Sequence, residues 1–298
     1  MSSPDETGNG AAPPGSPERK RVAVILSGCG NKDGSEIRES LFTMLALERA
    51  NVDVVFFAPD KSGPAVFDHL KGESNPAEPP RNVLVESARI ARGRVAALST
   101  LDPETIDAAI FPGGLGAGKV LSNFLEKGAV CEVDPEVVRT MRALWSAHKP
   151  LGFICLAPIL AARVLGPLAG VRITLGPRGT AAAKHAAVMG ADVRPCPATD
   201  IVVDENARVV STPAYMYDDV TLTQVLQGIE KLVRSVVAMT RQPKLKSGQR
   251  PNQKGGAGGS REPRRGGEAP APSDRRQESV QVRRRGNRPG ATPGRGSA

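Results

Sequence analysis

Apolar and polar positions along the middle of this chain follow two periods in turn, one typical of strands and one typical of helices. Short apolar runs bounded by charged or turn-forming residues predict strands at 21–27, 52–58, 106–111, 151–154 and 171–174. Longer amphipathic segments between them predict helices at 35–50, 83–91, 135–147, 156–165, 180–189 and 220–239. This alternation of strands with helices is typical of an α/β protein.

Continuous apolar strands, such as 52–58, are typical of a parallel sheet that helices cover on both faces. Segments 201–204 and 208–211 flank Glu205-Asn206-Ala207 and predict a hairpin. We therefore expect a mostly parallel sheet with helices on both faces and a small hairpin. Because ligands of such sheets bind beyond the carboxyl ends of the strands, candidate site residues are expected at that edge.

One predicted strand ends abruptly at a cysteine. Residues 151–154 are apolar, Cys155 follows, and the next helical pattern starts at once. A strand that turns sharply into a helix at a nucleophilic residue is a nucleophile elbow. The helix N-terminus would then point at the sulfur, and its dipole and free N–H groups favour thiolate over thiol. The alternative is a small buried apolar residue without chemistry.

A glycine-rich turn follows the predicted strand at 106–111. It reads Pro112-Gly-Gly-Leu-Gly-Ala-Gly-Lys119 and fits neither the dinucleotide-binding fingerprint nor the P-loop. Adjacent glycines let main-chain N–H groups approach a ligand closely, because no Cβ intervenes. Next to a cysteine elbow, such a turn indicates an oxyanion hole. A plain tight turn or a phosphate-binding loop is the alternative.

The two ends of the chain differ from the middle in composition. Residues 1–20 are rich in Ser, Pro and Gly, and residues 241–298 hold 15 of the 40 Lys and Arg but only 4 of the 31 Asp and Glu. Such segments cannot build a core, so we expect disorder on both sides of a single domain at 21–240. The basic tail would bind a nucleic acid or another polyanion by charge, or serve only as a solubilising extension.

The composition also bears on compartment and cofactors. Asp5, Glu6 and Glu18 argue against a transit peptide, and no apolar run is long enough for a membrane helix. The four cysteines contain no Cys-x-x-Cys pair, and the three histidines stand apart without metal-ligand spacing. We therefore expect a cytoplasmic protein with reduced thiols and no metal or other cofactor.

Twelve short blocks carry a resemblance to a known family: Val24-Ile-Leu-Ser-Gly-Cys-Gly30, Asp33-Gly-Ser-Glu-Ile37, Phe57-Ala-Pro-Asp60, Arg81-Asn-Val-Leu84, Pro112-Gly-Gly114, Leu121-Ser-Asn-Phe124, Pro150-Leu-Gly-Phe153, Cys155, Ala157-Pro158, Cys196-Pro197, Asp200-Ile-Val-Val-Asp204 and Thr212-Pro-Ala-Tyr-Met216. In this order they resemble the PfpI/ThiJ branch of the class I glutamine-amidotransferase-like superfamily. Within that branch they are most similar to ElbB-like proteins, described as isoprenoid-biosynthesis glyoxalases. The likeness runs from about residue 21 to 237, and neither tail takes part.

The resemblance implies a flavodoxin-like three-layer sandwich with Cys155 as the nucleophile. It implies that the N–H groups of Gly114 and Leu156 form the oxyanion hole. Three further residues are expected beside the substrate: Gly113, Cys29 and Pro158. A homodimer is expected, because family members commonly form one.

The resemblance also implies that a carboxylate from the first helix touches the thiol. Two glutamates qualify, Glu36 and Glu39, which are three residues apart and so roughly on one helix face. Asp33 and Glu36 have the spacing of a helix-capping pair, which would occupy Glu36. Glu39 is therefore favoured for catalysis.

One departure from the family bears on the chemistry. Relatives with a working Cys-His pair have histidine in the strand after the elbow helix, where this chain has Gly176 before Pro177. His185 lies further along, in a predicted helix, and is expected at the surface. Acyl transfer from an amide needs a base that protonates the leaving amine. Amidotransferase activity is therefore not expected.

An aldehyde rearrangement expels no amine, so the resemblance favours a glyoxalase that is independent of glutathione. Cys155 would add to glyoxal or a similar 2-oxoaldehyde as a hemithioacetal, and Glu39 would move the proton that leads to a 2-hydroxy acid. The competing hypothesis is a non-catalytic redox sensor or binding and chaperone-like module, with Cys29 as the resolving partner of Cys155. A third hypothesis makes the basic tail the functional part.

Overall fold

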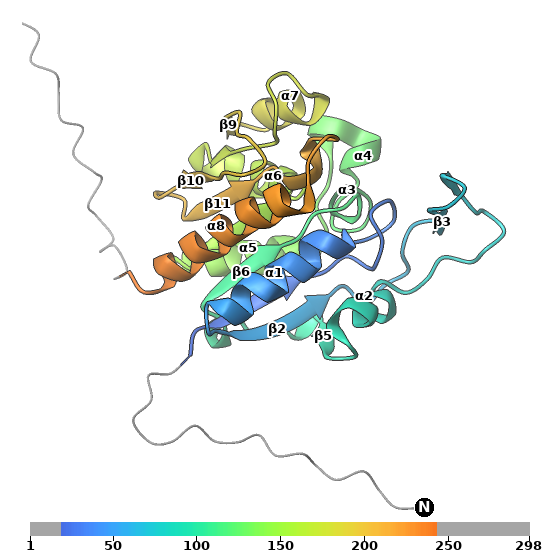
Figure 1. Ribbon diagram of the computed structural model, residues 1–298, viewed down its shortest axis with the longest axis horizontal. Coiled ribbons are helices and arrows are strands. Elements are labelled where there is room, and N and C mark those ends of the chain that lie inside the picture. The colour runs from blue at the N-terminus through green and yellow to red at the C-terminus, as the bar shows by residue number, and fades with distance from the viewer. Residues whose placement is uncertain (1–18, 243–298) are drawn as a thin grey trace, which may run out of the picture. The chain divides into compact units, whose positions relative to one another are not determined.

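A computed structural model describes residues 19–242 of the chain (Figure 1). The strands are β1 (Arg21–Ile25), β2 (Asp53–Ala58), β3 (Phe67–Asp68), β4 (Glu73–Ser74), β5 (Val95–Ala97), β6 (Ala108–Phe111), β7 (Leu151–Ile154), β8 (Arg172–Ile173), β9 (Asp192–Val193), β10 (Val202–Asp204) and β11 (Val209–Thr212). The α-helices are α1 (Ile37–Arg49), α2 (Val83–Ala91), α3 (Gly116–Lys119), α4 (Phe124–Lys127), α5 (Pro135–Ser146), α6 (Pro158–Ala169), α7 (Ala181–Val188) and α8 (Leu222–Thr240).

The centre of the described part is a seven-stranded sheet with the order β10-β11-β7-β6-β1-β2-β5. Its pairings are parallel except that of β10 with β11. Helices α1 and α8 lie side by side on one face, in front of the sheet in Figure 1, and α5 and α6 lie behind it. This three-layer arrangement confirms the predicted flavodoxin-like α/β fold.

The middle strands of the sheet lie in the core. Strands β6 and β7 are buried along their whole length, and so is β1 after its first residue. Phe111 and Phe153, from neighbouring strands, stack with ring centroids 4.9 Å apart. A strand buried on both faces needs apolar side chains at every position, which explains the continuous apolar runs in the sequence.

Several helices begin at side chains that accept a main-chain hydrogen bond. Asn82 accepts from the third residue of α2 at 3.0 Å, and Asp134 accepts from Glu136 at 2.9 Å at the start of α5. Thr221 and Gln224 form a capping box at the start of α8. These caps satisfy N–H groups that have no partner inside the helix, so the helices start where the sequence places such residues.

Several short elements differ from the sequence-based prediction, among them β3, β4 and α4, which were not expected. Strand β5 pairs in parallel with β2 at the edge of the sheet, and no strand was expected there. The predicted strand at 171–174 is only a two-residue pair of β8 with β9, separate from the main sheet. Short segments of this kind pair through tertiary contacts and have too little periodicity to be recognised.

No helix within residues 19–242 is long and apolar enough to cross a membrane. Segments 1–20 and 241–298, for which we expect disorder, lie almost entirely outside the described residues. The expected binding of a polyanion by the basic tail concerns those same residues. The predicted homodimer likewise remains a prediction.

Candidate active site

The turn between β7 and α6 places Cys155 at the carboxyl edge of the sheet. Cys155 has φ of 60°, a left-handed conformation that is uncommon for a residue with a side chain. Its N–H donates to the carbonyl of Thr212 at 2.9 Å, which continues the pairing of β7 with β11. Pro158 occupies the first turn of α6, where the missing N–H costs nothing. Together these contacts hold the backbone of a nucleophile elbow.

Two main-chain N–H groups interact with the Cys155 sulfur, those of Gly114 and Leu156, and both lower its pKa. Gly114 has φ of 96°, and a side chain there would collide with the backbone of Gly34 and Glu36. Glycine is therefore required at this position. The two N–H groups are placed so that they can also stabilise negative charge on an oxygen bound next to the sulfur.

Gly113 lies between the cysteine and a carboxyl group and leaves room for the two to meet. A Cβ at this position would collide with Cys155 and with the carboxyl group of Glu39. The N–H of Gly113 donates to Glu39 Oε2 at 2.9 Å. The absence of a side chain thus lets the sulfur and the carboxyl group approach each other.

Glu39 lies on α1 and is fully buried. Its Oε1 accepts from the N–H of Tyr215 at 3.4 Å, and the carboxyl group also interacts with the Cys155 thiol. Burial and the nearby charge of Glu36 raise the pKa of Glu39 to about 8, although the hydrogen bonds from Tyr215, Cys155 and Gly113 oppose that shift. Glu39 is therefore mostly protonated at neutral pH, with an ionised fraction that grows as the pH rises.

Glu36 has a structural role at the start of α1. Its carboxylate accepts from the N–H of Glu39 at 2.6 Å and caps the helix. The expected capping partner Asp33 is not used in this way, because its Oδ2 accepts from the N–H of Phe67 at 2.9 Å. Of the two glutamates that the sequence left open, the structure places Glu39 against the thiol and Glu36 at the helix end.

The Cys155 thiol differs from the expected thiolate. Burial raises its pKa well above the ordinary value and outweighs the lowering by the N–H groups of Gly114 and Leu156, and in molecules with Glu39 ionised the carboxylate raises the pKa further. The expectation of an ionised sulfur at rest is therefore wrong. A helix N-terminus favours the thiolate, but a dry site beside an acidic residue favours the thiol.

A cleft of about 760 Å³ opens at Cys155. Its walls combine residues from six segments: 31–38, 114–115, 124–128, 155–156, 181–185 and 215–218. Cys155 and Leu156 line it, whereas Glu39 is buried and is not part of the wall. A molecule in the cleft would therefore reach Glu39 only beside the Cys155 sulfur, where the carboxyl group contacts the thiol.

Comparisons with known proteins identify the family. No protein-family model matches the chain. A human protein named glutamine amidotransferase-like class 1 domain-containing protein 3, mitochondrial, is 43% identical over 230 residues, covering 74% of this chain and 83% of that protein. The ES1 protein homolog, mitochondrial, of Rattus norvegicus is 43% identical over 232 residues, covering 74% and 85%.

A solved structure agrees with these relatives. It is an isoprenoid biosynthesis protein with an amidotransferase-like domain from Ehrlichia chaffeensis, with a TM-score of 0.69, 38% identity, and coverage of 74% of this chain and 99% of that one. The chain belongs to the ES1/ElbB-like family. The resemblance stated from the sequence blocks is thereby confirmed, as is membership in the PfpI/ThiJ class of amidotransferase-like proteins.

The family members also correct the predicted compartment. The sequence predicted a cytoplasmic protein, but both relatives at 43% identity are named as mitochondrial proteins. The prediction depended on acidic residues near the N-terminus, whereas the likeness to the family lies in the folded domain. A few acidic residues near the N-terminus are therefore too weak a signal to decide the compartment.

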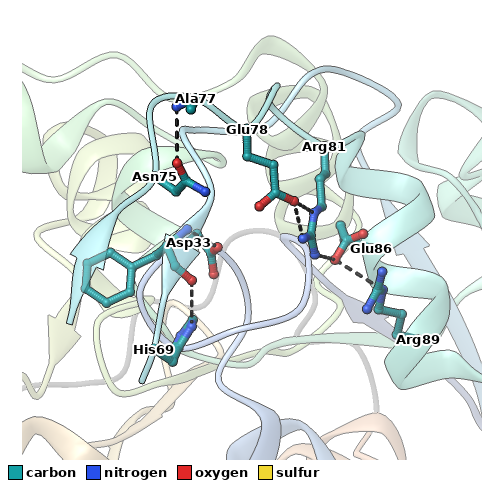
Figure 2. A network of polar contacts seen from close by, with 9 residues as sticks. Asp33, His69, Asn75, Ala77, Glu78, Arg81, Glu86 and Arg89 are labelled. Atoms are coloured by element: carbon teal, nitrogen blue, oxygen red, sulfur yellow. Dashed lines mark hydrogen bonds and ion pairs between the residues drawn. The ribbon is translucent and has the colours of Figure 1, made fainter. Parts of the chain in front are cut away.

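None of the three residues expected beside the substrate lines the cleft, and Gly113 lies instead against Cys155 and Glu39. Cys29 lines a different and much smaller cavity, next to Asp33 and Glu86, so the structure does not bring it to Cys155. Figure 2 shows the polar network around that second cavity, in which Glu86 pairs with Arg81 and Arg89. Pro158 is buried in α6 and does not line the cleft.

Most residues of the cleft wall were not assigned to the site from the sequence, and His185 and Tyr215 are two of them. His185 is exposed on α7, as expected, and it also lines the same cleft as Cys155. Tyr215 lines the cleft and donates its main-chain N–H to Glu39. The sequence did contain a signal for Tyr215, because this residue belongs to a block shared with the family. No motif marks His185.

Proposed function

We propose that this ES1/ElbB-like protein is a glutathione-independent glyoxalase that converts a 2-oxoaldehyde to a 2-hydroxy acid. The observation that supports it is the meeting of four groups at one point: the Cys155 thiol, the Glu39 carboxyl group and the N–H groups of Gly114 and Leu156. They supply a nucleophile, a proton acceptor and a site for an oxyanion.

The first step is addition of sulfur to the aldehyde carbon. In molecules with Glu39 ionised, the thiol proton moves to Glu39 while the S–C bond forms and the carbonyl π electrons move to oxygen. The N–H groups of Gly114 and Leu156 stabilise this oxygen. Glu39 then returns the proton to it, which gives a neutral hemithioacetal and restores the carboxylate.

The second step is a proton shift between neighbouring carbons. The Glu39 carboxylate removes the hydrogen from the carbon bound to sulfur, and the electron pair forms an enediolate with the adjacent carbonyl. Glu39 returns the proton to the adjacent carbon, and the hydroxyl proton passes to the second oxygen. The product is a thioester of a 2-hydroxy acid, which one water molecule hydrolyses to the acid and the free Cys155 thiol.

Other activities of this fold receive less support. No histidine within residues 19–242 interacts with Cys155, so a base that would protonate a leaving amine is missing from that part. A peroxide sensor would need an ionised thiol and a nearby resolving cysteine. Instead, the pKa of Cys155 is raised, and Cys29 lies in another cavity.

Glyoxal turnover followed by NMR of the product tests the proposal. Wild type is expected to form glycolate, Cys155→Ala to form none, and Glu39→Gln to lose about 100-fold or more in kcat/KM, because a glutamine cannot carry the proton. Cys196→Ala is the matched control, since Cys196 is a buried cysteine that does not line the cleft. Equal consumption of glyoxal by wild type and Cys155→Ala would remove the proposal.

A further inference from the structure

The cleft at Cys155 is much larger than glyoxal or methylglyoxal requires. Its volume of about 760 Å³ falls in the range of sites that enclose a ligand of many heavy atoms, roughly 300–1,000 Å³. A two- or three-carbon aldehyde bound to sulfur would leave most of the wall without a contact. The extra space therefore points to a substrate with a longer chain beyond the reacting carbons.

The charges along the cleft wall are balanced. It carries three cationic side chains and three acidic ones: Lys32, Arg38 and Lys127, and Glu36, Glu126 and Asp218. An anionic tail on the substrate would meet as many negative charges as positive ones, and an apolar tail would bury charged groups without partners. A chain of hydroxyl groups fits such a wall, because each hydroxyl both donates and accepts hydrogen bonds.

His185 offers a fixed hydrogen-bond donor in this wall. Its Nδ1 accepts from the N–H of Ala129 at 3.2 Å, so in the neutral ring the proton lies on Nε2. The ring packs edge-on against Phe124, with centroids 5.8 Å apart and planes at 87°. It also lies against Gly128, where a Cβ would come within 2.7 Å of the ring. These contacts hold one ring orientation in the cleft wall.

We propose that the substrate of this site is a polyhydroxylated, sugar-derived 2-oxoaldehyde, and that His185 Nε2 donates a hydrogen bond to a hydroxyl oxygen of its chain. This inference rests on the proposed function, since the aldehyde end is the part that reacts with Cys155. His185 is thereby a specificity-determining residue that acts away from the reacting carbons. Tyr217 and Asp218, which also line the cleft, supply further partners for the hydroxyl groups.

Kinetics with a matched pair of substitutions test the role of His185. The substrates are glyoxal and 3-deoxyglucosone, a 2-oxoaldehyde with a hydroxylated chain. Wild type is expected to prefer 3-deoxyglucosone in kcat/KM. His185→Asn keeps an oxygen near Nδ1 for the Ala129 N–H but loses the donor at Nε2, and is expected to reduce this preference by about tenfold, the value of one good hydrogen bond. His185→Gln places an amide near Nε2 and is expected to restore part of it.

The control is His148→Asn, a change at an exposed histidine with φ of 55° that does not line the cleft. Asparagine tolerates that left-handed backbone, so the substitution is expected to leave the preference as it is in wild type. A wild-type enzyme without a preference for 3-deoxyglucosone, or an equal loss with both substrates in His185→Asn, would overturn the inference.

A binding measurement separates this inference from the proposed function. Calorimetry on Cys155→Ser with the polyhydroxy acid 3-deoxygluconate and with glycolate needs no turnover. Tighter binding of 3-deoxygluconate, weakened about tenfold by adding His185→Asn, supports the inference even where no aldehyde is converted. Equal binding of the two acids contradicts it, even in an enzyme that converts glyoxal.

Discussion

At the scale of one residue, Gly113 determines whether the Cys155 sulfur and the Glu39 carboxyl group can come into contact. Its N–H holds Glu39 at 2.9 Å, and any side chain there would collide with both Glu39 and Cys155. We expect Gly113→Ala to displace the two groups and to lower kcat/KM for glyoxal by about 100-fold, the loss that a misplacement of about 1 Å causes. Steady-state kinetics measure this.

Gly118→Ala is the matched control for that substitution. The three atoms nearest to a Cβ at Gly118 would all belong to the side chain of Leu125, which is 44% exposed and can move away. A similar loss of activity in both variants would show that the glycine-rich turn tolerates no side chain anywhere, and that Gly113 has no special position.

Glu39 also links stability to pH. Its pKa is raised to about 8 in the folded protein, above the ordinary value of 4.5, so the folded state holds a proton that the unfolded state has released between these values. The contribution of Glu39 to the folding stability is therefore largest below about pH 4.5 and is lost as the pH rises through 8.

We expect the unfolding free energy of wild type to fall between pH 5 and pH 8.5, relative to Glu39→Gln, by an amount on the order of a few kcal/mol. Urea denaturation at the two pH values measures the difference. Parallel pH profiles for wild type and Glu39→Gln would contradict the raised pKa. Glyoxal turnover is expected to rise with pH, because the fraction of molecules with Glu39 ionised, which accepts the thiol proton, grows with pH.

At the scale of an element, the start of α1 connects helix stability to the chemistry. Glu36 caps the helix through the N–H of Glu39, and its charge is the second cause of the raised pKa of Glu39. We expect Glu36→Ala to cost about 1 kcal/mol of stability. We also expect it to move the pH midpoint of glyoxal turnover below that of wild type, because the repelling charge is gone.

Thr221→Ala removes a comparable cap, at the start of α8, without changing the charge near Glu39. It is expected to cost a similar amount of stability and to leave the pH midpoint in place. A shift of the midpoint in both variants would mean that loosening of the helices, and not the charge of Glu36, sets the pKa of Glu39.

The elements themselves were predictable to different degrees. Helix α2 was predicted over its observed range, 83–91, from its helical pattern, and the structure shows that Asn82 caps its start. Helix α1 begins at Ile37, two residues later than predicted, because Glu36 is the cap. Strand β5 was missed, since its three residues carry no period and pair only through the neighbouring β2.

At the scale of the whole molecule, the sheet order brings distant segments to one edge. Strands β1, β6, β7 and β11 are adjacent, so the loops that follow them converge at their carboxyl ends. Helix α1 packs beside α8, which places Glu39 under the turns that hold Gly113 and Tyr215. The candidate site is therefore a product of the strand order, as in other open α/β sheets.

The sequence by itself determined the class of the fold, the elbow at Cys155, the glycine turn and the family, because these depend on local periods and short motifs. Only the tertiary structure decided that Glu39 and not Glu36 meets the thiol, that Cys29 lies in another cavity and that His185 faces the cleft. Glu39 bonds to residues 74 and 176 positions away. Burial of the cysteine and the carboxyl group together also raises both pKa values, and burial is a property of the packed molecule that no local pattern of residues contains.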